Sequence, residues 1–192
     1  GQPAYEDVTA LLAGGAIVVA TDYPGMGTPG VHPYLDGISE GRAVLDSIRA
    51  ARDFGGTGPA AVTGLSQGGH ASIFAGAEWT TYAPDVDLRA VVPVAAPTFT
   101  SAAYAARDLL PNASAYVGII INGIVAARPD LDRTELLTES GLEAFDRLEA
   151  HDVTPGSWCS YGEIDVEADV RADPLTLPAW RDALVENEPG AR

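Results

Sequence analysis

The first hundred residues predict an α/β fold with a parallel sheet. Three short apolar runs, at residues 16–20, 60–62 and 88–96, are separated by segments with helical periodicity. A regular alternation of strands and helices of this kind predicts parallel strands joined by right-handed crossovers. The length of 192 residues is that of one domain with a single buried core.

The predicted elements begin with a helix over residues 2–13. Pro3 lies in its first turn, and a Gly pair follows its last residue, as is typical of helix ends. Residues 16–20 are continuously apolar, which predicts a strand buried on both faces of a parallel sheet. The turn-forming residues 21–30 follow this strand, where an open α/β sheet binds its ligands.

The next predicted elements are a helix over residues 34–53, a strand that enters a turn at Ser66, and a helix over residues 71–80. In the first of these helices the apolar residues recur at helical spacing and the charged residues lie on the other faces. The apolar set is Leu35, Ile38, Leu45 and Ile48, and the charged set is Glu40, Arg42, Asp46 and Arg49. Residues 88–96 form another buried strand, weakened by Pro93, which lacks a hydrogen-bond donor.

The character of the sequence changes near residue 98, beyond which no run predicts a secure strand. Helices are predicted over residues 101–110, 116–128, 134–150 and 178–186. Residues 118–121 are compatible with a strand by propensity, and periodicity does not decide so short a run. We therefore interpret residues 1–97 as a partial α/β core and residues 98–192 as a mainly helical cap or lid.

The composition excludes several classes of function. The net charge of -16, with no Lys among the 11 basic residues, argues against nucleic-acid binding and indicates a solvated acidic surface. The acidic stretch at residues 163–173 lacks the spacing of a calcium loop, so no metal or cofactor is predicted. Cys159 is the only cysteine, so it forms no disulfide within the chain. No apolar run has the length of a transmembrane helix.

The pentapeptide Gly64-Leu65-Ser66-Gln67-Gly68 carries the chemistry. It fits the G-x-S-x-G nucleophile elbow of the α/β-hydrolases, in which a strand ends in a strained serine and a helix begins at once. We expect the flanking glycines to remove Cβ atoms that would clash. Ser66 is then the candidate nucleophile, and the backbone N–H of Gln67 is one donor to the oxyanion.

A serine nucleophile also needs a base and a carboxylate, which follow it in the order Ser, Asp or Glu, His. His32 precedes Ser66, and His70 lies one helical turn after it, where packing or capping explains it better. His151 has the right order but lies in a predicted cap helix. We therefore expect the acid and base beyond Arg192 and the second oxyanion donor before residue 1. Tyr23 is a candidate substrate-binding residue, with plain packing as an equal alternative.

Several stretches together resemble the secretory lipase family, α/β-hydrolases related to the fungal lipase A type. The resemblance covers residues 1–97 well, and residues 180–190 look like the family's segment before its next core strand. The stretches that carry it are Asp22-Tyr23-Pro24-Gly25-Met26-Gly27, His32-Pro33-Tyr34-Leu35, Glu40-Gly41-Arg42-Ala43-Val44-Leu45-Asp46 and Gly64-Leu65-Ser66-Gln67-Gly68-Gly69-His70-Ala71.

The resemblance implies serine-dependent hydrolysis of carboxylic esters, including acylglycerols, by secreted extracellular enzymes with a helical lid. It implies that Ser66 is the nucleophile and the Gln67 N–H an oxyanion donor, and that acid and base follow the lid. It also implies that Cys159 matches a cysteine that forms a bridge, with a partner that the sequence does not identify. A small-molecule or lipid ester is then the expected substrate, with transient contact between the lid and a lipid interface.

Our expectation is a secreted lipase or esterase that forms an acyl-enzyme at Ser66, with the 192 residues alone having weak or no turnover. Two alternatives stay open. The first is a peptidase or amide hydrolase on the same fold, because the elbow does not distinguish ester from amide. The second is a non-catalytic protein that keeps the fold, which gains weight if the chain is complete. Acyl chain length and oligomeric state are left open by the sequence.

Overall fold

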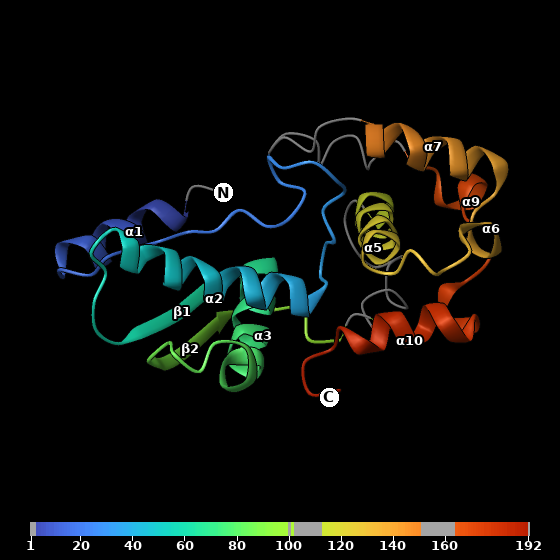
Figure 1. Ribbon diagram of the computed structural model, residues 1–192. Helices are drawn as coiled ribbons and strands as arrows, with labels where there is room; N and C mark the ends of the chain where they lie inside the picture. Colours follow the sequence, from blue (N-terminus) through green and yellow to red (C-terminus); the bar gives the residue numbers. More distant parts are fainter. Residues whose placement is uncertain (1–2, 100, 102–112, 151–163, 192) are drawn as a thin grey trace.

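Figure 1 shows the computed structural model of the chain, which describes residues 3–99, 101, 113–150 and 164–191. The elements form two groups side by side, one containing the sheet and one helical. The first group comprises α1 Pro3–Ala13, α2 Gly37–Asp53, β1 Ala60–Leu65, α3 Gln67–Tyr82 and β2 Leu88–Val94. The second comprises α5 Ala113–Ala127, α6 Arg133–Leu136, α7 Glu139–Ala150, α9 Val166–Asp169, η2 Pro174–Thr176 and α10 Pro178–Glu186.

Strands β1 and β2 pair in parallel, which confirms the predicted α/β arrangement for these segments. The register runs from Ala60 opposite Leu88 to Leu65 opposite Val94. Helix α3 connects the two strands and packs against both, and α2 packs against α3. Pro93 lies within β2, and this is compatible with proline's restriction to edge strands because β2 has β1 as its one described neighbour.

Residues 16–20 form no strand, so the prediction of a strand buried on both faces is wrong for the described chain. Ile17 is 63% exposed and Val19 is 42% exposed. A strand is stabilised by hydrogen bonds to a neighbour and by burial of its faces, and no described segment pairs with this run. Large apolar side chains of the sheet are exposed in the same way: Leu65, Val91, Val92 and Val94.

Helix α2 begins three residues later than its periodicity predicts. Asp36 is its N-cap, and the carboxylate accepts a hydrogen bond from the Ser39 N–H at 3.3 Å. Leu35 has a φ of 60°, which is incompatible with continuing a right-handed helix through this residue. The prediction that Glu40 lies on a polar face is also wrong, because this side chain is fully buried.

The sheet group has a small apolar core, formed where α2 and α3 meet β1 and the start of β2. Gly41 allows the two helices to approach closely, because a Cβ there would lie 2.6 Å from the Phe74 carbonyl carbon. The fully or nearly buried core residues are Leu45, Val62, Ala75, Ala83, Val86 and Leu88.

The second group is helical, as predicted for residues 98–192, with some changes of boundary. Residues 118–121 belong to α5, and the helix predicted over residues 178–186 matches α10. The helix predicted over 134–150 is two helices, because Leu137 forms an antiparallel bridge with Val170. The helix predicted over 101–110 lies outside the described residues except for Ser101. None of the described helices is both long and apolar enough to cross a membrane.

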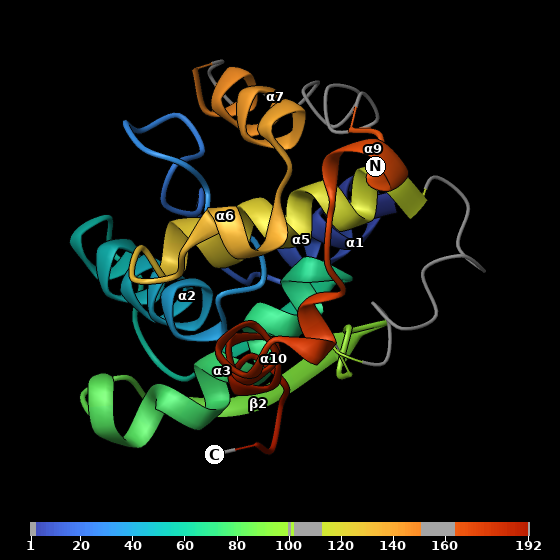
Figure 2. The same cartoon turned by 90° about the vertical axis from the view of Figure 1, so that its right-hand side faces the viewer.

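The core of the helical group includes two residues from the segment before α2. Tyr34 and Leu35 pack with residues of α5, α7 and α10, and Gly123 allows the close approach, since a Cβ there would lie 2.4 Å from the Tyr34 carbonyl oxygen. Trp180 on α10 is the largest fully buried side chain. Figure 2 shows α5 running between α7 and α10. The segment before α2 therefore joins the two groups.

Candidate active site

Ser66 forms a single-residue turn between β1 and α3. The strand ends at Leu65 and the helix begins at Gln67. The φ of 56° and ψ of -115° lie outside the helical and extended regions, a strained conformation for a residue with a Cβ. The Ser66 N–H donates a hydrogen bond to the Val94 carbonyl oxygen at 2.9 Å, which ties the turn to the end of β2.

The two glycines of the pentapeptide differ in how much space surrounds them. A Cβ on Gly64 would lie 2.4 Å from both the carbonyl carbon and the oxygen of Gly68, which are backbone atoms. A Cβ on Gly68 would meet no described atom within 4 Å outside its own helical turn. The expectation that both glycines avoid a clash is therefore confirmed for Gly64 and wrong for Gly68.

Two polar groups lie at adjacent residues of the turn. Ser66 is the N-cap of α3, but its hydroxyl makes no capping hydrogen bond, unlike most N-cap serines, and the residue is exposed. The Gln67 N–H is the first of the helix and has no acceptor within it. A hydroxyl without a capping role and a helix N-terminal N–H therefore lie at consecutive residues.

The Gln67 side chain turns into the protein and is held at its amide nitrogen. Its Nε2 donates to the Glu40 carboxylate, with 2.6 Å between Nε2 and Oε1, and also lies 2.6 Å from His32 Nε2. Both hydrogens of the amide are therefore used. No local sequence pattern predicts these contacts, because they join residues 27 and 35 positions apart.

His32 connects this amide to the loop at residues 21–30. Its Nδ1 lies 3.0 Å from the Pro24 carbonyl oxygen, which only accepts, so Nδ1 carries the hydrogen and Nε2 accepts from Gln67. Burial lowers the pKa of His32 below its ordinary value, outweighing the opposite effects of the Pro24 carbonyl and Glu40. The neutral imidazole that this arrangement requires is therefore favoured.

Tyr23, in the loop at residues 21–30, stacks on the His32 ring. The two ring centroids are 5.7 Å apart and the planes differ by 7°. Burial, followed by the charge of Glu40, raises the pKa of the Tyr23 hydroxyl above its usual range, so it stays protonated. The stacking accounts for the packing role of Tyr23, and its role toward a substrate stays a prediction.

Glu40 and His70, in the first turns of α2 and α3, form a buried hydrogen-bonded pair. Neither side chain is exposed, and His70 Nδ1 lies 3.0 Å from Glu40 Oε2. His70 Nε2 lies 2.8 Å from the Asn187 carbonyl oxygen. Because His70 is enclosed and bonded on both nitrogens, it is a packing residue, as expected. The Asn187 side-chain oxygen also accepts from the Gly37 N–H at 2.9 Å, so the end of α10 contacts both α2 and α3.

The structure brings no histidine to the Ser66 hydroxyl among the residues it describes. His32 and His70 are occupied by the contacts above, and His151 and Cys159 lie outside the described residues. Asp146, a carboxylate upstream of His151 in the sequence, pairs with Arg133 at 2.7 Å. The described part of the chain therefore supplies no identified acid or base for Ser66.

Much of the acidic stretch at residues 163–173 has structural roles. Asp165 and Asp173 are N-caps of α9 and η2, and Asp169 accepts hydrogen bonds from Ser140 and from the Asp165 N–H. No group of three or more potential metal ligands occurs among the described residues. These carboxylates cap helix N-termini and join loops.

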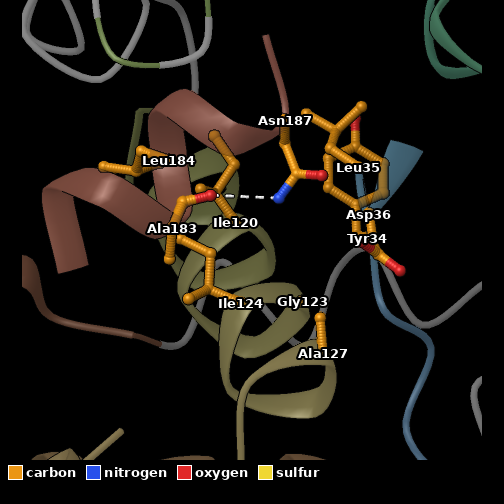
Figure 3. A pocket seen from close by; sticks show the side chains of 10 residues that line it. All are labelled: Tyr34, Leu35, Asp36, Ile120, Gly123, Ile124, Ala127, Ala183, Leu184 and Asn187. Carbon is orange, nitrogen blue, oxygen red and sulfur yellow. Dashed lines mark hydrogen bonds between the residues drawn. The ribbon is translucent and has the colours of Figure 1, made fainter. Parts of the chain in front are cut away.

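A small pocket lies between α5, α10 and the segment before α2 (Figure 3). It has about 10 Å³ of free volume, the room of roughly one water molecule. Asn187 closes one side, where its side-chain nitrogen donates to the Ala183 carbonyl oxygen at 3.0 Å. The lining residues are Tyr34, Leu35, Asp36, Ile120, Gly123, Ile124, Ala127, Ala183, Leu184 and Asn187. This pocket does not include Ser66 or Gln67.

The architecture and the turn at Ser66 define a partial α/β-hydrolase fold, and solved structures bear this out. Two X-ray structures of lipase A from Candida antarctica, one of them in its closed state, match with a TM-score of 0.61 and 19% sequence identity. Each match covers 81% of this chain and 38% of the lipase chain, so the chain spans less than half the length of these neighbours. At this identity the likeness shows the fold.

A sequence-family comparison is more specific. The secretory lipase family model matches residues 4–169, and the chain belongs to this family. No curated protein matches the chain. The match confirms the resemblance drawn from the sequence and extends it beyond residue 97 into the helical group.

Proposed function

We propose that the chain carries the nucleophile and one oxyanion donor of a serine carboxylic-ester hydrolase, a secreted lipase or esterase. The observation that carries the proposal is the geometry of Ser66, a strained, exposed serine between a strand and a helix with its hydroxyl unbonded in the described chain. This is the arrangement of a nucleophile elbow. Membership of the secretory lipase family supports an ester as the substrate and secretion as the location.

In the proposed reaction the Ser66 Oγ attacks the carbonyl carbon of the ester while its proton passes to a general base. The negative charge that develops on the carbonyl oxygen is stabilised by the Gln67 N–H, at the positive end of α3. The C–O bond to the alcohol then breaks, and the alcohol leaves with a proton. Water hydrolyses the acyl-enzyme to a carboxylic acid and free Ser66. We assign the base and its acid to no described residue.

We propose in addition that the helical group from residue 98 onward acts as a cap or lid over the acyl site and contacts a lipid interface. Support comes from its apolar core, which packs α5, α7 and α10 together, and from Tyr34 and Leu35, which join this core to the sheet group. Tyr23 is proposed to line the substrate site, because its loop reaches Gln67 through His32.

The test is covalent labelling and turnover in the complete natural chain. A fluorophosphonate should modify Ser66, and Ser66→Ala should abolish both labelling and hydrolysis of p-nitrophenyl esters. Esters of increasing chain length are compared with aminoacyl amides, and a preference for the amides would favour the peptidase alternative. Absence of labelling in a folded chain would favour the non-catalytic alternative.

A further inference from the structure

We propose that Glu40 is a positioning residue for the oxyanion donor, holding the Gln67 side chain so that the adjoining backbone N–H keeps its direction. The inference rests on the proposed function, since it concerns how that site is held in place. It follows from three features. Hydrogen-bond donors surround the buried Glu40 carboxylate, the hydrogen bonds of the Gln67 side chain each have a fixed direction, and the backbone of the preceding residue, Ser66, is strained.

The Glu40 carboxylate is fully buried and has three hydrogen-bond donors around it. Oε1 accepts from the Gln67 amide at 2.6 Å and from the Leu35 N–H at 3.0 Å. Oε2 faces His70 Nδ1 at 3.0 Å. Burying a charge costs free energy, and even a well-paired buried ion gains little over an apolar side chain of similar volume. The feature that an apolar residue would not reproduce is the fixed direction of these bonds.

The donors and acceptors around Gln67 allow one arrangement. The Pro24 carbonyl only accepts, so His32 donates from Nδ1 and accepts at Nε2. The Gln67 amide must therefore point its nitrogen, not its oxygen, at His32 and at Glu40. A rotated amide would place an oxygen against two acceptors. The side chain of Gln67 is thus held at both of its N–H groups.

This matters because the Gln67 N–H belongs to the peptide bond that directly follows Ser66. The direction of that N–H is set by the ψ of Ser66, which is -115° in a strained conformation. Strained backbone persists when its surroundings hold it. A donor to an oxyanion accelerates a reaction when its direction is fixed in advance. The tether from Gln67 to Glu40 supplies such a restraint on the residue that bears the donor.

The test is steady-state kinetics on a p-nitrophenyl ester with the complete natural chain. Gln67→Ala removes the tether and leaves the backbone N–H, so we expect kcat to fall about 10- to 100-fold with KM within about twofold. Glu40→Leu should lower kcat to a similar extent. In Glu40→Gln the oxygen can still accept from Gln67 while the new amide donates to His70, so kcat should stay within about threefold.

Glu78→Gln is the matched control, because Glu78 pairs with Arg42 where the same two helices meet and faces solvent in part. Its kcat should be unchanged. Circular dichroism and thermal unfolding establish that each variant is folded. If Glu40→Leu does not fold, Gln67→Ala, whose side chain is half-buried, decides the question. The double variant Glu40→Gln with Gln67→Ala should be no slower than Gln67→Ala, because the tether is already lost.

The proposal is overturned if folded Gln67→Ala keeps the wild-type kcat, or if only its KM changes. It is overturned equally if Glu40→Gln is as slow as Glu40→Leu, since the carboxylate charge and not the tether would then be needed. Ser66→Ala separates this outcome from the proposed function. Activity in Ser66→Ala contradicts the function itself, whereas loss of activity there with a normal Gln67→Ala contradicts the positioning role alone.

Discussion

The close contact of Gly64 with Gly68 predicts that Gly64→Ala disturbs the turn itself. A Cβ on Gly64 would lie 2.4 Å from two backbone atoms of Gly68, and ordinary contacts begin at 3.4 Å, so the start of α3 must move by about 1 Å. The atoms that clash belong to the backbone, so no side-chain rotation relieves the contact. Overpacking of this kind costs roughly 1–3 kcal/mol. We expect a value near the upper end.

Urea unfolding of the complete natural chain measures this cost. With a slope of about 2 kcal/mol per M, a loss of roughly 2–3 kcal/mol lowers the midpoint by about 1–1.5 M. Gly68→Ala is the matched control in the same turn. It meets no described atom within 4 Å and gains the helix propensity of Ala, so its midpoint should stay or rise by up to about 0.5 M.

Activity gives a second readout of the same displacement. Because Ser66 and Gln67 lie between the two glycines, a shift of about 1 Å moves the hydroxyl and the donor relative to each other, and about a 100-fold loss of kcat is expected for Gly64→Ala. Equal midpoints for Gly64→Ala and Gly68→Ala would refute the reasoning. So would a destabilised Gly64→Ala with normal turnover, because the clash would then be relieved away from the site.

Three further predictions follow from the packing and the network. The fold favours neutral His32, so its contribution to stability is complete above its ordinary pKa of about 6.5 and is lost as the pH falls below that value. In a plot of the urea midpoint against pH, His32→Gln should reduce the slope below about pH 6.5, and an unchanged slope would contradict the assignment. Asn187→Ala leaves the Gly37 N–H without its acceptor and should cost about 1–3 kcal/mol by urea unfolding; a neutral result would show that water replaces it. Trp180→Ala empties a fully buried site and should cost about 3–5 kcal/mol, whereas Val185→Ala on the exposed side of the same helix should stay within about 0.5 kcal/mol; similar values for both would be inconsistent with the core described.

The parts of the fold that depend on local pattern are predictable from the sequence. Helix α10, the strand before Ser66 and the parallel pairing of β1 with β2 all agree with their predictions. Residues 16–20 do not, because a strand depends on a neighbour that the apolar run itself does not specify. The start of α2 fails for a related reason, since the periodicity includes Leu35 although the backbone there turns left-handed. Long-range partners and single-residue strain are not encoded in periodicity.

The residues of the candidate site also divide into those that a local pattern predicts and those that it does not. The pentapeptide identifies Ser66 and Gln67 because strand, turn and helix are contiguous there. The charge pattern predicts a polar face for Glu40, although it lies three residues after Gly37 and four before Val44, both on the packed side of α2. That spacing is the one local signal of its burial. The contacts from Glu40 to Gln67 and His70 join residues 27 and 30 positions apart, and no local pattern predicts them.

The strained residues give the strongest physical link between the fold and the proposed chemistry. Positive φ values at residues other than glycine cost about 1–3 kcal/mol each and need restraint by their surroundings. Ser66 is restrained through its N–H on Val94 and through the side chain of the next residue, while the Leu35 N–H is held by the same carboxylate that holds Gln67. Glu40 therefore acts at two of the three described positions of this kind, the third being Ala95. One buried carboxylate beside the turn thus links the packing of α2 to the direction of the groups at Ser66, and the variants at Glu40 and Gln67 test that link.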